Sequence, residues 1–322
     1  MRLRLIPDDT SIDFFRYAPA TFGASCVAMV LALVVWFFMG LNYGIDFQGG
    51  TSLRTASDTP VDVAEYRAAL DPLELGDVTI SEVYDPTSDG TRHVAMVRIQ
   101  SQEGQESATP ELIASIQTAL QTVAPDIQFT SVESVGPKVS GELITTALIA
   151  VGASLGAILI YIWLRFEWQF SVGAVAALFH DVILTIGIFS LLQIRFDLPV
   201  IAAILTIIGY SINDTVVIFD RLRENLRKYK KRALREVMNL SVNETLSRTI
   251  MTSGTTLLAL IALLVLGGDV IRGFVFAITW GVIVGTYSSV YVAKNVVLYL
   301  GVKRDWSKPD ANAGNQYANI DA

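Results

Sequence analysis

The sequence predicts a polytopic α-helical membrane protein with six transmembrane helices and one extracytoplasmic α+β domain between the first two. Of its 322 residues, 52% are hydrophobic and only 17% are charged, whereas soluble chains carry about 25% charged residues. Six apolar runs are long enough to cross the hydrocarbon core of a bilayer, which takes about 20 residues. Basic and acidic residues are also sorted into different segments. These observations exclude a soluble enzyme.

The six predicted transmembrane helices occupy most of the chain. The first is expected to be retained as a helix, because it is long enough to span a bilayer and has no clear small-residue cleavage site. It contains Cys26, the only cysteine, so an intrachain disulfide is impossible. The predicted spans are residues 19–41, 142–164, 169–192, 198–220, 250–267 and 273–300.

The distribution of Lys and Arg predicts how these helices are oriented. Residues 221–249 contain nine basic residues against three Glu, and the terminal segments 1–18 and 301–322 carry further basic residues. Because basic loops stay in the cytoplasm, these three segments are predicted to be cytoplasmic. Residues 42–140, with 15 acidic and five basic residues, then lie outside. The basic loop could also bind anionic lipid or a partner, although topology alone explains its charge.

The exported segment 42–140 reads as a small α/β domain. Helices are predicted at 60–71 and 109–124, each opened by a Thr followed by Pro, which is a good helix start. The element order β-α-β-β-α-β is that of a ferredoxin-like split unit. The predicted strands are residues 51–56, 77–84, 92–100 and 127–135.

This domain shows no sign of catalysis or of a cofactor. His93 has no neighbouring Cys or His cluster, so we predict no metal site. Asp85, Pro86, Asp89 and Gly90 are typical of a hairpin turn. A ferredoxin-like fold by itself says little about function, because many unrelated activities use it.

Two predicted helices carry aspartates deep in the membrane. An ionisable residue near the bilayer centre costs about 2.5–3.5 kcal/mol, so each marks a candidate functional site. Asp214 lies in the fourth span next to Asn213, and Asp181 follows His180 in the third. Asp214 could titrate in a proton path or make a structural interhelical bond. For Asp181 and His180, helix pairing and transport both remain open.

The fifth span begins with a polar stripe that could face Asp214. Its members share one helical face and are Arg248, Thr252, Thr255 and Thr256. Asp214 and Arg248 both lie toward the cytoplasmic side, so an Asp–Arg contact is expected, although Arg248 could instead reach the interface. Lys294 and Asp220 are assigned to the interface. Small residues that allow close helix packing are Gly152, Gly156, Gly281, Gly285 and Ser289.

Five motifs in order resemble the SecF family of bacterial Sec translocases, over residues 12–305. The first contains Gly44, Asp46, Gly49 and Gly50. The motifs are GIDFQGG (44–50), VGPKVSGEL (135–143), HDV (180–182), GYSINDTVVIFDRLREN (209–225) and TYSSVYVA (286–293).

The resemblance implies a role in protein export. SecF proteins pair with SecD in an architecture of the resistance-nodulation-division superfamily, and associate with the SecYEG channel and often with YajC and YidC. The complex uses the proton-motive force to complete preprotein translocation across the inner membrane, after the ATP-driven steps of SecA. In the family, the residues matching Asp214 and Arg248 belong to the proton-responsive site. A Gram-negative source is expected.

Other functions make different predictions. No G-x-x-x-x-G-K-[ST] loop is present, so nucleotide hydrolysis by that route is not expected, and we predict neither an enzyme, a cofactor nor a nucleic-acid partner. A half-transporter for small molecules or lipids is the main alternative, although such exporters usually carry two six-helix halves on one chain. A scaffold without proton function is the other, and it predicts that neutral replacements of Asp214 are harmless.

Overall fold

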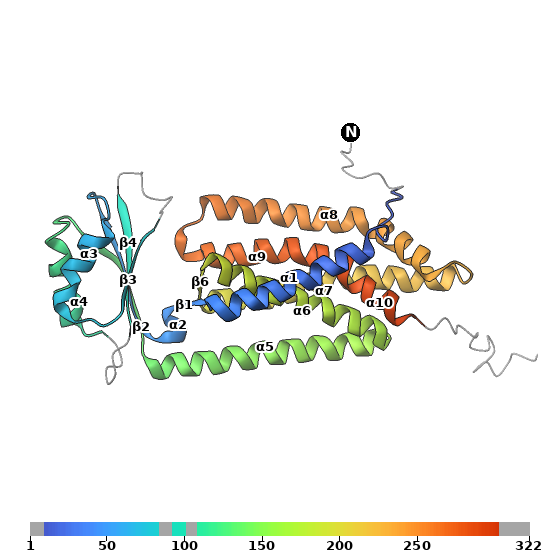
Figure 1. Ribbon diagram of the computed structural model, residues 1–322, viewed down its shortest axis with the longest axis horizontal. Helices are drawn as coiled ribbons and strands as arrows, with labels where there is room; N and C mark the ends of the chain where they lie inside the picture. The colour runs from blue at the N-terminus through green and yellow to red at the C-terminus, as the bar shows by residue number, and fades with distance from the viewer. Residues whose placement is uncertain (1–9, 84–91, 101–107, 303–322) are drawn as a thin grey trace, which may run out of the picture.

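The computed structural model describes residues 10–83, 92–100 and 108–302. The molecule is elongated, with a bundle of long helices at one end and a sheet covered by two short helices at the other (Figure 1). Within the described residues, six helices are long and apolar enough to cross a membrane. They are α1 (Ala18–Met39), α5 (Pro137–Arg165), α6 (Trp168–Leu192), α7 (Leu198–Lys228), α8 (Leu234–Leu266) and α9 (Asp269–Ser288), the last continuing through a π-helical turn, η2 (Ser289–Ala293), into α10 (Lys294–Leu300).

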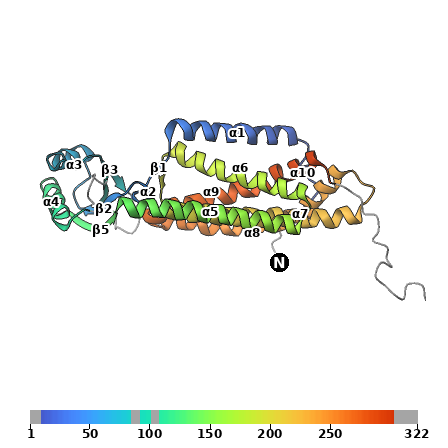
Figure 2. The same cartoon turned by 90° about the horizontal axis from the view of Figure 1, so that it is seen from below.

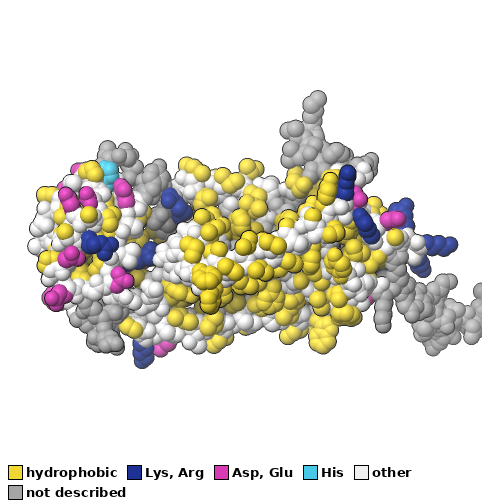
Figure 3. Space-filling model, in the orientation of Figure 1, with side chains coloured by type: hydrophobic (Ala, Val, Ile, Leu, Met, Phe, Trp, Pro, Cys, Tyr) yellow, Lys and Arg dark blue, Asp and Glu magenta, His cyan; other side chains and the backbone are white. Residues whose placement is uncertain are grey.

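The six long helices divide into an inner and a peripheral set. The apolar windows of α6, α7 and the α9–α10 helix are 39–44% buried within the chain, whereas those of α1, α5 and α8 are 6–11% buried. Figure 2 shows α1 lying along α6, on the outside of the bundle. Hydrophobic side chains dominate the visible surface of the bundle in Figure 3. The peripheral helices therefore offer wide apolar surfaces to lipid or to another chain.

The helices α6, α7 and α9 pack closely at glycines. A Cβ at Gly281 of α9 would lie 2.2 Å from Ile207 of α7, and one at Gly285 would lie 3.0 Å from Ser211. Gly281 and Gly285 therefore allow α7 and α9 to approach, as the sequence predicts. By contrast, Gly152 and Gly156 on α5 have open space around them.

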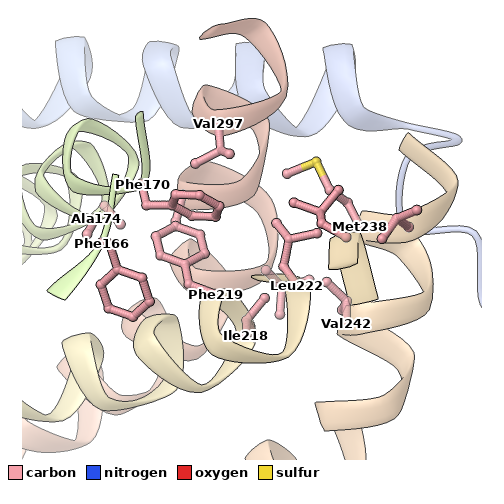
Figure 4. Packing of buried hydrophobic residues seen from close by; sticks show 14 of the residues in the cluster. Phe166, Phe170, Ala174, Ile218, Phe219, Leu222, Met238, Val242 and Val297 are labelled. Carbon is pink, nitrogen blue, oxygen red and sulfur yellow. The ribbon is translucent and has the colours of Figure 1, made fainter. Parts of the chain in front are cut away.

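An aromatic cluster fills the bundle at the end distant from the sheet. Phe170 and Phe219 stack edge-to-face with centroids 5.1 Å apart, and Leu222, Met238 and Val297 pack around them (Figure 4). Side chains from α6, α7, α8 and α10 thus meet in one core that joins the inner helices to the start of α8.

The segment 221–249, expected to be a loop, is helical for most of its length. α7 continues to Lys228 and α8 begins at Leu234, which leaves residues 229–233 as the connection. Arg221 pairs with Glu224 one turn later and with Glu244 on α8, at 2.6 and 2.7 Å. Hydropathy marks where the apolar part of a helix stops, but charged residues of good helix propensity continue the helix beyond that point.

The sheet has four antiparallel strands, and their order is β3-β4-β2-β5. Thr109 caps α4 as predicted, whereas Asp62 caps α3 in place of the expected Thr59. Both helices contribute to one core on the sheet, with Tyr66 and Ile116 buried. The expected hairpin turn at 85–90 lies outside the described residues. The elements are β2 (Gly50–Ser57), α3 (Val63–Leu70), η1 (Asp71–Leu73), β3 (Val78–Val83), β4 (His93–Ile99), α4 (Pro110–Gln121) and β5 (Gln128–Val135).

Short elements connect the sheet to the bundle. The two-residue strands β1 (Asn42–Tyr43) and β6 (Arg195–Phe196) pair in parallel. A single helical turn, α2 (Ile45–Gln48), follows β1, and β2 begins two residues after it. The ends of α1, α6 and α7 and the first strand of the sheet therefore meet within a few residues of chain.

Candidate functional site

Asp214 lies in the interior of the bundle on α7, with 4% of its surface exposed. Two residues of α8, Ser253 and Arg248, act electrostatically on its carboxylate. The Oδ2 atom has no hydrogen-bond partner among the described residues. A buried carboxylate with an unused acceptor is uncommon, because buried polar atoms are nearly always bonded.

The polar stripe predicted on α8 faces Asp214 only in part. Arg248 is exposed and forms no ion pair with Asp214 among the described residues, so the direct Asp–Arg contact is not observed and only the charge of Arg248 acts on the carboxylate. Thr252 is half-buried and its hydroxyl donates to the carbonyl of Thr249 on its own helix, at 3.0 Å. The residue that reaches Asp214 is Ser253, which the sequence reasoning missed because it lies beside the stripe. Ser253 also bonds to Thr286 of α9, at 2.7 Å.

Asn213, next to Asp214, is exposed on the surface of α7. Adjacent residues on a helix point about 100° apart, so a buried Asp214 turns Asn213 outward. The structure therefore does not bring Asn213 to the carboxylate of Asp214. Together with Arg248, it places polar atoms on the apolar surface of this isolated chain.

Asp181 lies at the centre of a buried hydrogen-bond network and is 1% exposed. Its Oδ2 accepts from Ser211 of α7 at 2.5 Å and from Ser288 of α9 at 2.9 Å. Its Oδ1 lies 2.9 Å from Nδ1 of His180. The carboxylate of Asp181 thus joins the three inner helices.

His180 extends this network toward α1. Its ring is fully buried and stacks on Tyr287, with centroids 6.0 Å apart. The Tyr287 hydroxyl donates to the carbonyl of Thr21 and lies 3.0 Å from the hydroxyl of Ser25, both on α1. The Nε2 atom of His180 has no partner among the described residues. The side chains of His180 and Tyr287 therefore tie α6 and α9 to a peripheral helix.

Hydroxyl groups connect the surroundings of the two aspartates. Ser211, which donates to Asp181, lies one turn before Asp214 on α7. Ser289 of η2 bonds to Thr215 at 2.9 Å and donates to the carbonyl of Ser211 at 3.4 Å. π-Helical turns such as η2 are rare and occur frequently at functional sites. The sequence signal for this connection is the pair of serines in TYSSVYVA, a motif used in the sequence analysis for the family resemblance and, at Ser289, for helix packing.

Lys294, expected at the interface, is instead buried, with 1% exposure. Its ammonium lies 4.0 Å from the ring centroid of Phe15 and within 5.4 Å of those of Phe14 and Tyr291, in the range of cation–π attraction. The chain before α1 folds over this end of the bundle and covers Lys294. Hydropathy gives the depth of a residue along its own helix, but it cannot show that another segment covers it. Asp220, by contrast, is partly exposed and pairs with Arg165 at 2.7 Å.

The GIDFQGG segment lies at the junction of sheet and bundle. Gly49 and Gly50 have positive φ angles of 72° and 123°, which L-residues with a side chain rarely adopt. A Cβ at Gly44 would lie 3.2 Å from that of Asp197. The Oδ2 atom of Asp46 accepts a hydrogen bond from the backbone N–H of Leu198, at 2.9 Å. This motif therefore touches the first residue of α7, the helix that carries Asp214.

Two family models match the chain. The model for the C-terminal part of the protein export membrane proteins SecD/SecF matches residues 115–303, and the model for the SecD/SecF GG motif matches residues 34–61. The two matches together include Asp46, both buried aspartates and Arg248.

Curated relatives match over nearly their whole length. Protein translocase subunit SecF of Cereibacter sphaeroides is 65% identical over 321 residues, which is 100% of this chain and 99% of the relative. The SecF subunit of Rhodobacter capsulatus is 61% identical, with 96% and 95% covered, and that of Vibrio alginolyticus is 38% identical, with 95% of each covered.

Solved structures of SecDF share the fold. SecDF of Thermus thermophilus, a translocon-associated membrane protein, superposes with a TM-score of 0.82 at 37% identity, and a SecDF structure in a super-membrane-facing form with 0.67 at 38% identity. The matches cover 92% and 91% of this chain but only 39% of each SecDF chain. By its family models and its relatives, the chain belongs to the SecF family of protein translocase subunits.

Proposed function

We propose that this chain couples the proton-motive force to the completion of preprotein translocation, after the ATP-driven steps of SecA. The observation that carries the proposal is Asp214, a carboxylate buried in a transmembrane helix. One of its oxygens has no hydrogen-bond partner among the residues that the structure describes, and the charge of Arg248 is in electrostatic reach. Asp214 would take up and release the proton, and Arg248 would tune it.

The energetics support such a role. Burial penalises the charged carboxylate, whereas a nearby guanidinium stabilises it. The protonation of Asp214 therefore depends on its separation from Arg248, which lies on a different helix. One charge crossing 100 mV yields about 2.3 kcal/mol, enough to shift the populations of two states that differ by a few kcal/mol. Protonation can in this way move α8 relative to α7.

A SecD chain is the proposed partner. The solved SecDF chains carry in one polypeptide both the part that this chain matches and a larger remainder, which leaves room for a complementary SecD half. The open surfaces at Gly152 and Gly156 and the exposed polar groups of Asn213 and Arg248 suit a protein neighbour better than lipid. SecYEG, and also YajC and YidC, are further partners that the family resemblance implies, in the inner membrane of a Gram-negative bacterium.

The sheet domain is proposed to lie outside the membrane as a ferredoxin-like unit. Its strand order β3-β4-β2-β5 and two helices support that assignment. In Figure 3, acidic side chains are prominent on the sheet domain and basic ones at the opposite end of the bundle, in line with the positive-inside rule. By this rule residues 42–140 are expected to lie outside the membrane, and residues 221–249 and both termini in the cytoplasm.

Cysteine labelling would test this orientation. Ser115 on α4 and Lys231 between α7 and α8 are exposed, so Cys can replace either after Cys26→Ala. We expect an impermeant maleimide added from outside intact inner-membrane vesicles of native orientation to label Ser115→Cys and to miss Lys231→Cys. The reverse pattern would overturn the orientation. Ser241 is fully buried and would be a poor reporter.

Asp214→Asn tests the proton function. It imitates a permanently protonated carboxyl at nearly constant volume, so insertion into the membrane and copurification with SecD should persist. We expect the uncoupler-sensitive part of preprotein export to be lost, while ATP-dependent translocation continues. The matched control is Asp220→Asn, on the same helix but paired at the surface with Arg165, which should export normally. If Asp214→Asn membranes keep the uncoupler-sensitive export of the unaltered protein, the scaffold function replaces this proposal.

A further inference from the structure

The start of α7 is held by a residue from elsewhere in the chain. The first N–H groups of a helix have no partner within it and are usually bonded by the side chain at the N-cap. Here the carboxylate of the N-cap residue Asp197 is not hydrogen-bonded to the N–H of Leu198, although the N–H of Val200 lies close enough to lower its pKa. Instead Asp46, 152 residues earlier in the sequence, accepts from the N–H of Leu198 at 2.9 Å.

Backbone bonds hold Asp46 at this position. The N–H of Gly44 donates to the carbonyl of Phe196 at 2.7 Å, next to the β1–β6 pairing. The hydroxyl of Ser140, near the start of α5, donates to the carbonyls of Ile45 and Asp46, at 3.2 and 2.9 Å. The short helix α2 is therefore fixed between α5 and the beginning of α7.

The same segment leads directly into the sheet. After α2, Gly49 and Gly50 turn the chain into β2, an inner strand that pairs with both β4 and β5. A second contact crosses the junction, since Nη1 of Arg195 in β6 lies 3.5 Å from the sulfur of Met96 in β4. The sheet is thus attached to the first turn of α7 by the short segment 44–50, which is held in place by hydrogen bonds.

We propose that Asp46 is a positioning residue that makes the sheet domain follow α7, so that a displacement caused at Asp214 reaches the exported domain. α7 is one continuous helix from Leu198 through Asp214, a distance of about 24 Å at 1.5 Å per residue. A rigid helix transmits a shift or tilt from Asp214 to its first turn, where Asp46 holds it. The proposal rests on the proposed proton function and assigns the coupling to the GIDFQGG motif.

The test compares two caps of the same kind. Asp46→Ala removes the bond to α7, whereas Asp62→Ala removes a local cap of α3 within the sheet domain, where Asp62 accepts from the N–H groups of Ala64 and Glu65. Losing a cap typically costs enough to shift a two-state population about fivefold. Asp46→Asn keeps an acceptor and should restore the unaltered behaviour.

Two measurements on the full complex with SecD in lipid vesicles separate the outcomes. The first is the distance distribution between spin labels at Ser115→Cys on α4 and Thr206→Cys on α7, both exposed positions. The second is uncoupler-sensitive export. We expect Asp46→Ala to broaden the distribution and to reduce that export about fivefold, and Asp62→Ala to change neither. The distance measurement remains informative even if Asp214→Asn shows that export does not depend on Asp214.

Three results would overturn the proposal: an unchanged distance distribution in Asp46→Ala, equal broadening in Asp62→Ala, or broadening with undiminished uncoupler-sensitive export. If Asp46→Ala does not accumulate in the membrane, Ser140→Ala provides a milder version. It removes the two bonds that fix α2 to α5 and should broaden the distribution in the same direction. A narrow distribution in Ser140→Ala would then count against the proposal.

Discussion

Asp181 and Asp214, which are buried within the long helices α6 and α7, differ in how completely their carboxylates are bonded. Asp181 has a partner for each oxygen, and its three partners come from α6, α7 and α9. Asp214 is nearly as buried, but its Oδ2 has no hydrogen-bond partner within the described part of the chain, and the two groups that act on its carboxylate, Ser253 and Arg248, both belong to α8. A fully bonded carboxylate resists any change, because each lost bond leaves a buried donor unpaired. Burial alone therefore does not distinguish a candidate proton switch from a structural carboxylate, whereas an unused acceptor beside a charge on another helix favours the candidate switch.

The largest expected effect is on the stability of the bundle. Asp181→Asn cannot accept all the bonds of the carboxylate, so it should leave a buried donor unpaired and lower the free energy of unfolding by about 1–3 kcal/mol. Asp214→Asn should lower it less than Asp181→Asn does, since Oδ2 of Asp214 has no hydrogen-bond partner to lose among the described residues. Thermal unfolding of the purified proteins in one detergent would measure both.

Equal loss of stability in the two variants would break the comparison, because it would make Asp214 as structural as Asp181. A stable Asp181→Asn protein that loses uncoupler-sensitive export would break it in the other direction, by assigning Asp181 to transport. The sequence leaves that alternative open for Asp181 and His180. The bonds to Ser211 and Ser288 favour helix pairing.

A double-mutant cycle would sharpen the difference. Ser211 donates to Asp181 but lies one turn from Asp214. We expect a coupling energy of about 0.5–3 kcal/mol between Ser211→Ala and Asp181→Asn, as for residues in one network. Between Ser211→Ala and Asp214→Asn the coupling energy should be smaller, because no hydrogen bond joins these two side chains among the described residues. Additive effects in the first pair would show that the Ser211–Asp181 bond does not hold the helices together.

The smallest expected effect is a pH dependence of stability that arises outside the membrane-spanning helices. There too a hydrogen-bonded aspartate, Asp126, contrasts with a buried one, Asp197. Bonds from the N–H of Asp58 and the hydroxyl of Ser57 hold the pKa of the Asp126 carboxyl below its ordinary value of 3.8. Burial raises the pKa of Asp197 above 3.8, although the Arg195 guanidinium opposes this. Asp126 therefore adds stability that is present above pH 3.8 and is lost as the pH falls through its lowered pKa.

For Asp197 the sign is reversed. Its raised pKa adds stability that is fully present below pH 3.8 and is lost as the pH rises through the raised value. Infrared titration of isotope-labelled aspartate should show a carboxyl that titrates above pH 3.8 and is missing from Asp197→Asn, and another that titrates below pH 3.8 and is missing from Asp126→Asn. Two titrations at the ordinary value would contradict both assignments.

The sequence predicts much of this fold because its signals are local. Apolar length gives the six long helices, and alternation with turn and cap residues gives the strands and helices of the sheet domain within about three residues. The burial of Lys294 and the helical course of residues 221–249 were not predictable in this way. Lys294 is covered by a segment nearly 280 residues earlier in the chain, and contacts of that range leave no periodic pattern.

The candidate site is predictable in its principal residues but not in its geometry. The cost of a charge in hydrocarbon singles out Asp214 and Asp181 on their own helices. Which neighbour reaches each carboxylate depends on the rotation of the packed helices. That rotation places Ser253, and not Thr252, beside Asp214, and turns Asn213 outward. Neighbouring residues on a helix point about 100° apart, so a shift of one residue moves a side chain from the site to the outer surface of the bundle.

The glycine contact between α7 and α9 affects how easily the helices of the bundle can move past one another. Because Gly281 has no side chain, Ile207 of α7 packs directly against the backbone of α9. Sliding α7 along α9 would therefore require the Ile207 side chain to leave this contact. The apolar part of α8 is largely unburied. No neighbouring side chain packs against Gly254 of α8 as Ile207 packs against Gly281. The bundle thus combines a rigid pair of helices, α7 and α9, with a more loosely packed helix, α8. A displacement that begins at Asp214 would therefore deform α8 more than α7 or α9. Amide hydrogen exchange should accordingly be slower along α7 and α9 than along α8.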